Sequence, residues 1–578
     1  MNLVAVIETK LWEGTVGSAF YTENEVQRET TYTYYAGTMV YELISPDQEI
    51  YRMQSYSQLI DPELTIDDLA TLGERLELPE GWSYEARILE AEEFMVADGL
   101  ALVINDELGN SYQKSVGEGV VVASNVTPAL NGTGIYTTVT GFEHADAGRT
   151  HQFESATFGG SMTDPSNNDV SIRIAPEVYP GAYNIVTRDR NELFVYFGVY
   201  GENEASTGPT VARLDADTLE EVWRTQIAEF SAETWNYPGA LGLHGNGNLY
   251  MVGGNILASL DPDTGEILNQ INLPTEDGAN SSYNGFVSTA DGTIFVKPIY
   301  RACDAVGGNA LVECPDAQTS SVLSAINPDT LEIIVQVEVP QPVFSRLVVG
   351  NHNGQDYVYM QGVNSLFRFA WDGSALTLDD DWGFVEVLQE GQVGTAAPSI
   401  TEGWLFFNTN GLPSSTTPMT LWAISTTDSS QRYDISPFAD ITGDSSFNIS
   451  MGSFDSENSV AYLVDAGAGS SAAIAFDPAT GFEMLWREDQ STIAYTMLVG
   501  PPEARVFVAT NLTGAGSRIN PLLSRSEQIV FRDAATGLEL ARTGRLDRMN
   551  GGANLVPGFD GRFYFPGSDN TLSEITVD

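Results

Sequence analysis

The stretch SLDPDTGEILNQINL, from Ser259 to Leu273, decides the fold, because near-copies of it recur along the chain. Each copy has a short apolar run, an Asp-x-x-Thr turn and a second apolar run, which is the pattern of a β-hairpin. The copies align on Asp215, Asp261, Asn327, Asp372, Ser425, Asp477, Asp533 and Asp578. Their separations are 46, 66, 45, 53, 52, 56 and 45 residues, the range of one propeller blade with its loops.

A second hairpin signal lies upstream of most copies, as in STADGTIFVKP around Gly292 and PGFDGRFYFPG around Gly561. Two hairpins per unit give four strands, which we name A to D from the axis outward. The last unit ends after its third strand, and an open sheet edge is a liability. We therefore expect NDVSIRIA, Asn168 to Ala175, to supply the missing outer strand and close an eight-bladed ring over residues 168–578.

The turn followed by Trp, in LDADTLEEVW and FDPATGFEMLW, resembles the quinoprotein-like (PQQ-like) propeller superfamily over about residues 168–578. That superfamily includes dehydrogenases, assembly scaffolds and exported proteins, so the resemblance implies architecture more than activity. Its quinone enzymes commonly use a disulfide between adjacent cysteines and a calcium site of Glu, Asn and Asp. Neither pattern is present in this sequence, so we predict no cofactor and leave a calcium ion open.

Residues 1–115 lack the repeat and predict a small α+β domain that precedes the mainly β propeller. TTYTYYAG, TMVYELISP, EIYRMQSYS and GWSYEARIL read as strands, and DPELTIDDLATLGERL reads as a helix. The run from MQSYSQLIDPELT to INDELGNSYQK resembles a family of small exported bacterial proteins over most of residues 29–114. Residues 116–167, rich in Gly, Thr, Ser and Asn, are expected to form an irregular connection.

The composition is strongly acidic, with 79 Asp and Glu against 26 Lys and Arg and a formal charge of −53. Such a field repels phosphate backbones and anionic membranes, which excludes nucleic acid as a partner. Only three residues are lysines, which suits a solvated surface in a marine or halophilic setting. We expect an extracytoplasmic protein, periplasmic or secreted, whose leader is not part of this sequence. No apolar run is long enough for a membrane span.

Cys303 and Cys314 lie in one polar insertion and predict a local disulfide, although two reduced thiols fit the same spacing. The pair Asp261 and Asp263 resembles part of a calcium loop, but calcium needs six to eight oxygens and the next residues form a strand. Hydrogen bonding within a turn explains these carboxylates better. His144 and His151, near Glu143 and Asp146, are open to either a metal site or an ordinary loop.

Polar residues recur at the start of the innermost strands and predict a ring around one mouth of the channel. They are Asn184, Asn284, Arg346, Asn448, Thr496 and Asn554, joined by the aromatic residues Trp235, Tyr237 and Tyr283. This ring is a candidate site for a polar ligand. Satisfaction of backbone groups and packing between blades is the alternative explanation.

The sequence thus predicts an exported, soluble propeller that acts as a binding or scaffold protein for a polar small molecule, a glycan or an envelope protein. The alternative is a propeller enzyme, a polysaccharide lyase, hydrolase or lactonase, with its site at the same mouth. No catalytic residue is predicted, because no nucleophile, base and orienting group form a motif. A plugged channel favours the scaffold, whereas a cluster of Tyr, His and Arg across the mouth favours the enzyme.

Overall fold

The computed structural model describes the chain from residue 134 to residue 578, except 199–206, 230–238, 275–280, 301–320, 344, 395–396, 402, 412–416, 442–445, 447–450, 514–525 and 550–553. Before residue 134 it describes only the backbone of seven strands. Cys303, Cys314 and the expected N-terminal helix lie outside the described residues. The disulfide and the division into domains therefore stay predictions.

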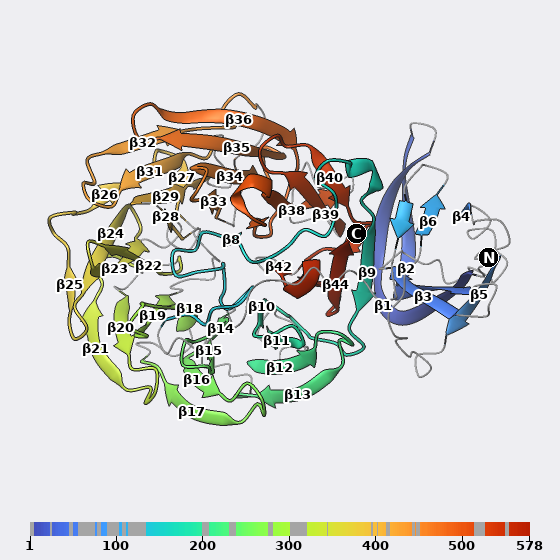
Figure 1. Ribbon diagram of the computed structural model, residues 1–578, viewed down its shortest axis with the longest axis horizontal. Helices are drawn as coiled ribbons and strands as arrows, with labels where there is room; N and C mark the ends of the chain where they lie inside the picture. Colours follow the sequence, from blue (N-terminus) through green and yellow to red (C-terminus); the bar gives the residue numbers. More distant parts are fainter. Residues whose placement is uncertain are drawn as a thin grey trace.

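Eight sheets, antiparallel except for one added strand in blade 7, are arranged around one axis (Figure 1). Blades 1 to 3 follow the simple order of four consecutive strands. Blade 1 has β10 (Asn184–Thr187), β11 (Glu192–Phe197), β12 (Thr210–Asp215) and β13 (Glu221–Gln226). Blade 2 has β14 (Ala240–Leu243), β15 (Leu249–Gly253), β16 (Ile256–Leu260) and β17 (Ile267–Asn272). Blade 3 has β18 (Ser281–Ser288), β19 (Ile294–Tyr300), β20 (Val322–Ile326) and β21 (Ile333–Glu338).

Blades 4 to 6 keep this order with small additions. Blade 4 has β22 (Val348–His352), β23 (Gln355–Gln361), β24 (Ser365–Trp371), β25 (Leu376–Leu378) and the short β26 (Val385–Glu386) on β24. Blade 5 has β28 (Ser399–Thr401), β29 (Trp404–Asn408), β31 (Leu421–Ser425) and β32 (Arg432–Ile435), beside the pair β27 (Gln392–Val393) and β30 (Asn410–Gly411). Blade 6 has β33 (Ser453–Asp455), β34 (Val460–Asp465), β35 (Ser470–Asp477) and β36 (Gly481–Asp489).

Blades 7 and 8 recruit strands from earlier in the chain. Blade 7 has β37 (Met497–Val499), β38 (Val506–Thr513), β39 (Ser526–Asp533), β40 (Glu539–Arg542) and β41 (Leu546–Asp547), with β8 (Gln152–Phe153) parallel to β37. Blade 8 has β42 (Val556–Pro557), β43 (Arg562–Pro566), β44 (Leu572–Val577) and β9 (Val170–Ile174). Within the described residues, 3₁₀ turns lie at Pro165–Asn167, Pro502–Ala504 and Phe559–Gly561.

The chain is an eight-bladed β-propeller. Its ring closes as expected from the repeat, because β9 pairs antiparallel with β44 and becomes the outer strand of blade 8. Ile172 lies opposite Ile575, and Arg173 forms an ion pair with Glu574 at 2.8 Å. The strand NDVSIRIA thus completes the sheet to which the C-terminal residues belong, and the predicted fold class is confirmed.

The repeated acidic turns lie between strands C and D of their blades. Asp261 Oδ1 accepts hydrogen bonds from the amides of Asp263 and Thr264, at 2.8 and 2.9 Å. Asn327 makes the equivalent bonds at 2.9 and 3.0 Å in blade 3. These side chains therefore hold turns at the outer edge of the ring, and turn formation accounts for the repeat that reveals the fold.

Tryptophans on the outer strands join one blade to the next. Trp223 of blade 1 donates a hydrogen bond from Nε1 to the carbonyl of Pro262 in blade 2, at 3.2 Å. Its ring covers Gly265, where a Cβ would lie 2.5 Å from the indole and where φ is +73°. Trp486 of blade 6 repeats this contact on the turn of blade 7. The Trp after the turn is therefore a connection between blades.

The backbone of the N-terminal part forms two sheets. One has the order β1 (Ala5–Glu23), β5 (Ser83–Leu89), β2 (Val26–Ile44), β3 (Ile50–Ser55), and the other joins β4 (Leu76–Glu77), β6 (Val103–Asp106) and β7 (Ser111–Gln113). The first of these sheets lies beside β9 at the edge of blade 8 (Figure 1).

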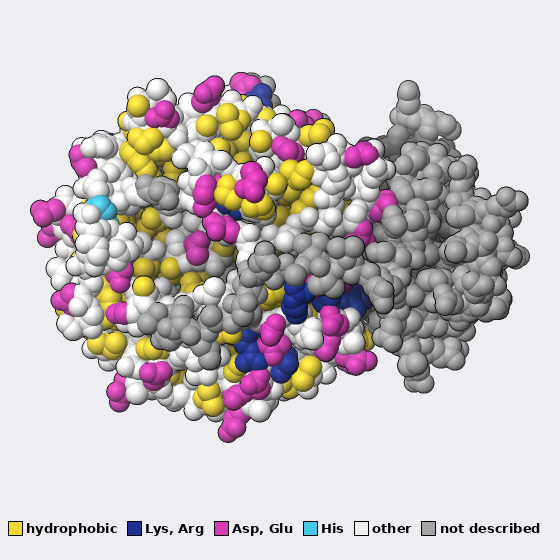
Figure 2. All heavy atoms as spheres, viewed as in Figure 1, with side chains coloured by type: hydrophobic (Ala, Val, Ile, Leu, Met, Phe, Trp, Pro, Cys, Tyr) yellow, Lys and Arg dark blue, Asp and Glu magenta, His cyan; other side chains and the backbone are white. Residues whose placement is uncertain are grey.

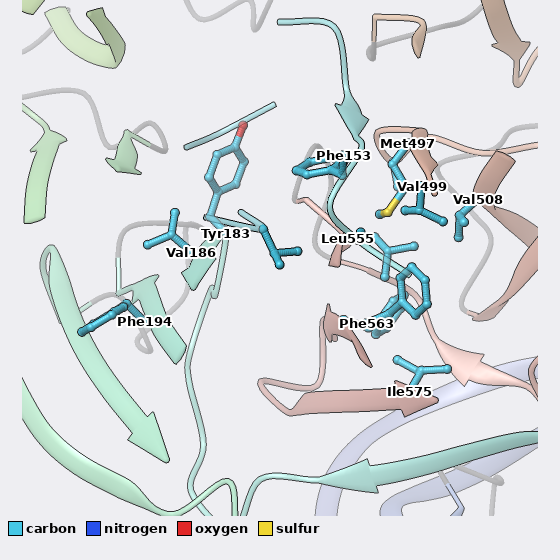
Figure 3. Close-up of a cluster of buried hydrophobic side chains, with 14 of the residues drawn as sticks. Phe153, Tyr183, Val186, Phe194, Met497, Val499, Val508, Leu555, Phe563 and Ile575 are labelled. Atoms are coloured by element: carbon cyan, nitrogen blue, oxygen red, sulfur yellow. The ribbon is translucent and has the colours of Figure 1, made fainter. Parts of the chain in front are cut away.

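The core lies between neighbouring blades and reaches the axis. In one cluster Val186 and Phe194 of blade 1 join Val499 of blade 7 and Phe563 of blade 8. Phe153, which precedes the ring in sequence, lies beside Met497 and Val499 in the same cluster (Figure 3). A segment from before the first blade is therefore part of the propeller core.

Candidate functional site

Residues 134–158, named here the axial segment, cross the middle of the ring (Figure 1). The segment has few regular strands, and its backbone instead pairs with the inner strands of the blades. Isolated bridges join Ile135 to His244 and Phe142 to Gly242 in blade 2, and β8 extends blade 7. The axial segment thus supplies hydrogen-bond partners for peptide groups along the edges of the inner strands.

Hydrogen bonds connect the axial segment to every blade. In blades 1 and 2, Thr187 and Leu243 donate their amides to the carbonyls of Thr140 and Gly141 at 2.8 and 2.7 Å. In blades 4 to 7 the donors are the amides of Val349, Ile400, Phe454 and Leu498, and the acceptors are the carbonyls of Ala147, Gly148, Thr150 and His151, at 2.8 to 2.9 Å. Arg149 donates to the carbonyl of Phe286 in blade 3, and Thr140 Oγ1 to that of Pro557 in blade 8. The segment therefore fills the axis at the end where strands A turn into strands B.

The central part of this segment holds an unusual backbone. His144, Ala145, Arg149 and His151 have φ between +54° and +77°, a region that costs a residue with a side chain about 1–3 kcal/mol each. Gly148 lies against blade 5, where an added Cβ would come 2.7 Å from the carbonyl of Ile400. The surrounding blades hold this loop in place, and strain of this kind is typical of functional or tightly constrained positions.

Glu143 is the acidic centre of the axis. Its side chain is fully buried, and Oε2 accepts hydrogen bonds from Arg149 at 3.0 Å and from Arg346 at 2.8 Å. Burial alone would raise the pKa of Glu143, but Arg346, His144 and Arg149 hold that pKa well below its usual range. The carboxylate is therefore ionised, and one acid holds two guanidinium groups from distant parts of the chain.

Two histidines of the segment lie beside this carboxylate. His144 and His151 are stacked with ring centroids 4.6 Å apart, and Tyr495 packs on His144 at 4.3 Å. His144 Nε2 is 3.4 Å from Glu143 Oε1, but burial lowers the pKa of His144 to about 4. Burial likewise holds the pKa of His151 well below its usual value. Both imidazoles are therefore neutral at pH 7.

A lysine and a tyrosine complete what we name the axial cluster: Tyr183, Glu143, His144, Arg149, Lys297, Arg346 and Tyr495. Arg346 donates to the hydroxyl of Tyr183 at 2.6 Å and lies over its ring. Lys297 is 1% exposed, and its Nζ donates to Asn284 Oδ1 at 3.1 Å. Burial lowers the pKa of Lys297 well below its usual value, and the nearby Arg346 and Arg149 add to this effect. The cluster combines Tyr, His and Arg within contact of one another.

The structure brings some of the predicted mouth residues together. Arg346 is in the cluster, and Asn284 contacts it through Lys297. The backbone N–H of Asn554 donates a hydrogen bond to the carbonyl of Tyr183 at 3.1 Å. The carbonyl of Thr496 lies 2.9 Å from Nδ1 of His151, whose ring stacks on the cluster residue His144. These residues share the neighbourhood that the aligned strand starts predict.

Other predicted residues face elsewhere. Asn184 Oδ1 accepts the amide of Leu241 at 2.5 Å and so ties blade 1 to blade 2. Tyr283 donates its hydroxyl to the carbonyl of Pro274 at 2.6 Å. Trp235, Tyr237 and Asn448 lie outside the described residues. Asn184 and Tyr283 are both buried, and the polar groups named above bond within the protein. Whether any of these residues binds a ligand stays a prediction.

The sequence reasoning missed the roles of Arg149 and Lys297 and saw Glu143 only as a possible metal neighbour. Two signals were available. Lys297 is one of three lysines and sits in the apolar strand FVKPIY. Glu143, His144, Asp146, Arg149 and His151 form a dense run of ionisable residues in a stretch otherwise rich in small polar ones.

The donor groups at the axis do not fit a calcium-bound quinone. The carboxylate of Glu143 faces two guanidinium groups, and the amide oxygen of Asn284 accepts a hydrogen bond from Nζ of Lys297. A calcium ion needs such oxygens for itself. Within the described part of the chain, no three His, Cys, Asp or Glu side chains are grouped to hold one metal ion.

No protein-family model matches the chain, and no curated protein matches its sequence. Among solved structures, it is similar to quinohemoprotein alcohol dehydrogenase from Comamonas testosteroni, with a TM-score of 0.49 and 11% identity over 75% of this chain and 80% of that one. A europium-containing methanol dehydrogenase gives 0.48 and 10% over 78% and 91% of the two chains. BamB from Moraxella catarrhalis gives 0.42 and 13% over 70% and 98%. At this identity the likeness concerns the fold alone.

Proposed function

We propose that this protein is an extracytoplasmic binding or scaffold protein for a polar ligand, a glycan or an envelope partner. The observation that carries the proposal is the axial segment, whose hydrogen bonds to all eight blades close one end of the channel. A ring that is filled by its own chain offers its faces and loops, rather than a passage, to a partner.

The surface supports the same proposal. Asp and Glu side chains outnumber basic ones over much of the face in Figure 2. Surplus carboxylates keep a protein soluble and steer cationic or hydrogen-bonding partners toward it. Among the described residues, no helix is long and apolar enough to cross a membrane.

The test is a combined binding and turnover screen on the full chain. Neutral and acidic oligosaccharides, polysaccharides, lactones and candidate envelope proteins are assayed for binding by calorimetry and for product formation by chromatography. We expect saturable binding of at least one of them with no product. Turnover that depends on the axial cluster would overturn the proposal, as would the absence of any binding.

The enzyme alternative is kept because of one observation. A chain of contacts no longer than 3.4 Å between polar side-chain atoms joins Tyr183 to Arg346, Arg346 to Glu143 and Glu143 to His144. Proton transfer needs a cluster of this kind. Its members are at most 7% exposed, so a substrate would require the loops around them to open.

Two variants separate the alternatives. Tyr183→Phe removes the hydroxyl next to Arg346 and keeps the ring. Tyr359→Phe is the matched control, because Tyr359 is a buried tyrosine of blade 4, outside the axial cluster, whose hydroxyl also accepts a hydrogen bond from an arginine, Arg368, at 2.8 Å. A binding protein keeps its ligand in the control, and shows no turnover in any variant. Turnover present in the parent and in Tyr359→Phe but lost in Tyr183→Phe would establish the enzyme.

A further inference from the structure

A pocket of about 100 Å³ lies between blades 5 and 6, on the face that carries the turns between strands A and B. Trp404 and Phe406 of β29 form its blade 5 side, and Phe454 and Phe476 form its blade 6 side. It is separate from the axial cluster, and none of its lining residues is a predicted site residue. All four side chains also belong to the hydrophobic cluster that packs blades 5 and 6 together.

The aromatic rings meet at steep angles. Phe406 and Phe476 are perpendicular, with centroids 5.4 Å apart, and Trp404 meets Phe476 at 68° and 4.8 Å. Phe454 stacks on Phe406 at 4.9 Å, which fixes the orientation of that wall. Walls set at an angle form a corner in which a compact group can contact more than one ring, and the faces of these rings carry negative charge.

The polar side of the pocket is acidic. Asp455 lines it with a fully buried side chain, and its carboxylate lies 3.4 Å from Arg505 Nε. Arg505 also contacts Glu457 at 2.6 Å and Glu154 at 3.8 Å, so three carboxylates share one guanidinium. The hydroxyl of Thr401, another lining residue, is buried and has no hydrogen-bond partner among the described groups. Asp455 is therefore the carboxylate of the lining, Glu457 and Glu154 are exposed neighbours that share a hydrogen bond, and the hydroxyl of Thr401 is unsatisfied.

We propose that this pocket binds the methylated ammonium group of a small organic cation. Aromatic faces attract cations, and a methylated ammonium gives up water more readily than a primary ammonium or a metal ion does. A cavity of about 150 Å³ admits benzene, so by proportion 100 Å³ admits a group of about four heavy atoms, the size of trimethylammonium. The acidic side chains supply the charge that such a group complements.

The pocket also communicates with the axial segment. Ser456 lines the pocket and donates its amide to Gln152 Oε1 at 2.9 Å, and Gln152 in turn donates to Glu154 at 2.6 Å. Phe454 donates its amide to the carbonyl of Thr150. A bound cation would thus contact residues that help to hold the axial segment on blade 6.

Calorimetric titration of the full chain tests the proposal with a matched pair of probes. Choline carries a trimethylammonium group, and 3,3-dimethylbutan-1-ol is its neutral counterpart of the same shape. We expect saturable binding of choline and at least about tenfold weaker binding of the alcohol. Equal binding of the two would overturn the cation assignment, and the binding of neither would overturn the site.

Trp404→Leu and Trp422→Leu locate the binding. Trp422 lies in the same blade on β31 and does not line the pocket. We expect Trp404→Leu to weaken choline binding at least about tenfold and Trp422→Leu to leave it unchanged. Should Trp404→Leu fail to fold, Asp455→Asn provides the same test, with near-ultraviolet circular dichroism as the folding control.

Choline binding unchanged in both pocket variants would contradict the proposal. Neither result bears on the axial cluster, so failure here leaves the proposed function standing.

Discussion

Glu143 and Arg346 are 203 residues apart in sequence, and their side chains meet at 2.8 Å on the axis of the propeller. Glu143 belongs to the axial segment, and Arg346 to the loop that enters the inner strand of blade 4. Because both side chains are buried, their contact ties the segment to the ring as well as neutralising charge. The same carboxylate also pairs with Arg149, so removing the charge of Glu143 should weaken both contacts at the centre of the molecule.

Glu143→Gln should destabilise the fold by about 3–5 kcal/mol, because it leaves two buried guanidinium groups without a counter-charge. The free energy of unfolding is measured by urea denaturation at pH 7. Glu483→Gln, an exposed position on β36, is the control and should change it by no more than about 0.5 kcal/mol. A loss in Glu143→Gln as small as in the control would show that the axial ion pairs do not hold the ring.

Gly265→Ala should separate backbone strain from the contact between blades. Both Gly265 and Gly373 lie in turns between strands C and D with positive φ, +73° and +91°. Only at Gly265 does an added Cβ meet a neighbour, the indole of Trp223 at 2.5 Å, whereas at Gly373 nothing lies within 4 Å. We expect Gly373→Ala to cost about 1–2 kcal/mol and Gly265→Ala about 1–3 kcal/mol more, measured by denaturant unfolding. Equal losses would mean that Trp223 does not dock on this turn.

His144 should make stability depend on pH in a defined window. Its pKa is about 4 in the folded protein and 6.5 ordinarily, so below pH 6.5 the unfolded chain binds a proton that the folded chain does not. The contribution of His144 to the free energy of unfolding is therefore fully present above pH 6.5. It is lost as the pH falls toward 4, by up to about 1.4 kcal/mol per pH unit.

His144→Asn should flatten this part of the profile, and Asn tolerates the positive φ at position 144. The difference in unfolding free energy between parent and variant is compared at pH 8, 6 and 4.5. We expect the parent to lose more stability than the variant on acidification. Parallel profiles for the two proteins would argue against a buried neutral imidazole.

Gly148→Ala should weaken the docking of the axial segment on blade 5. The new Cβ would lie 2.7 Å from the carbonyl of Ile400, and backbone on both sides leaves little room for adjustment. A loss of about 1–3 kcal/mol is expected. Gly544→Ala, where nothing lies within 4 Å, is the control and should be close to neutral. Similar effects at the two positions would contradict tight docking.

The propeller could be read from the sequence because its determinants are local. Asp261 accepts hydrogen bonds from amides two and three residues later, so its turn leaves a pattern that repeats with the blade. The spacing of the repeat also predicted the closing strand, because it places Asn168–Ala175 where the outer strand of the eighth blade is needed. Strand pairing and turn chemistry are thus visible without tertiary information.

The axial cluster could be read only in part. Alignment of the inner strands pointed to Arg346 and Asn284, because all A strands start at the same end of the channel. It could not find Glu143 or Arg149, since the axial segment has no periodicity and its hydrogen bonds to the blades join residues 47 to 417 positions apart. The partner that neutralises Arg346 was therefore invisible in any single repeat.

Hydrogen–deuterium exchange of the inner strands tests the closure of the axis most directly. The amides of Val349, Ile400, Phe454 and Leu498 lie on the strands nearest the axis and donate to carbonyls of the axial segment. We predict that they exchange as slowly as amides of the neighbouring B strands, and faster in Gly148→Ala. Rapid exchange of these four amides in the parent protein, as at a solvent-exposed sheet edge, would contradict a channel closed by the chain's own segment.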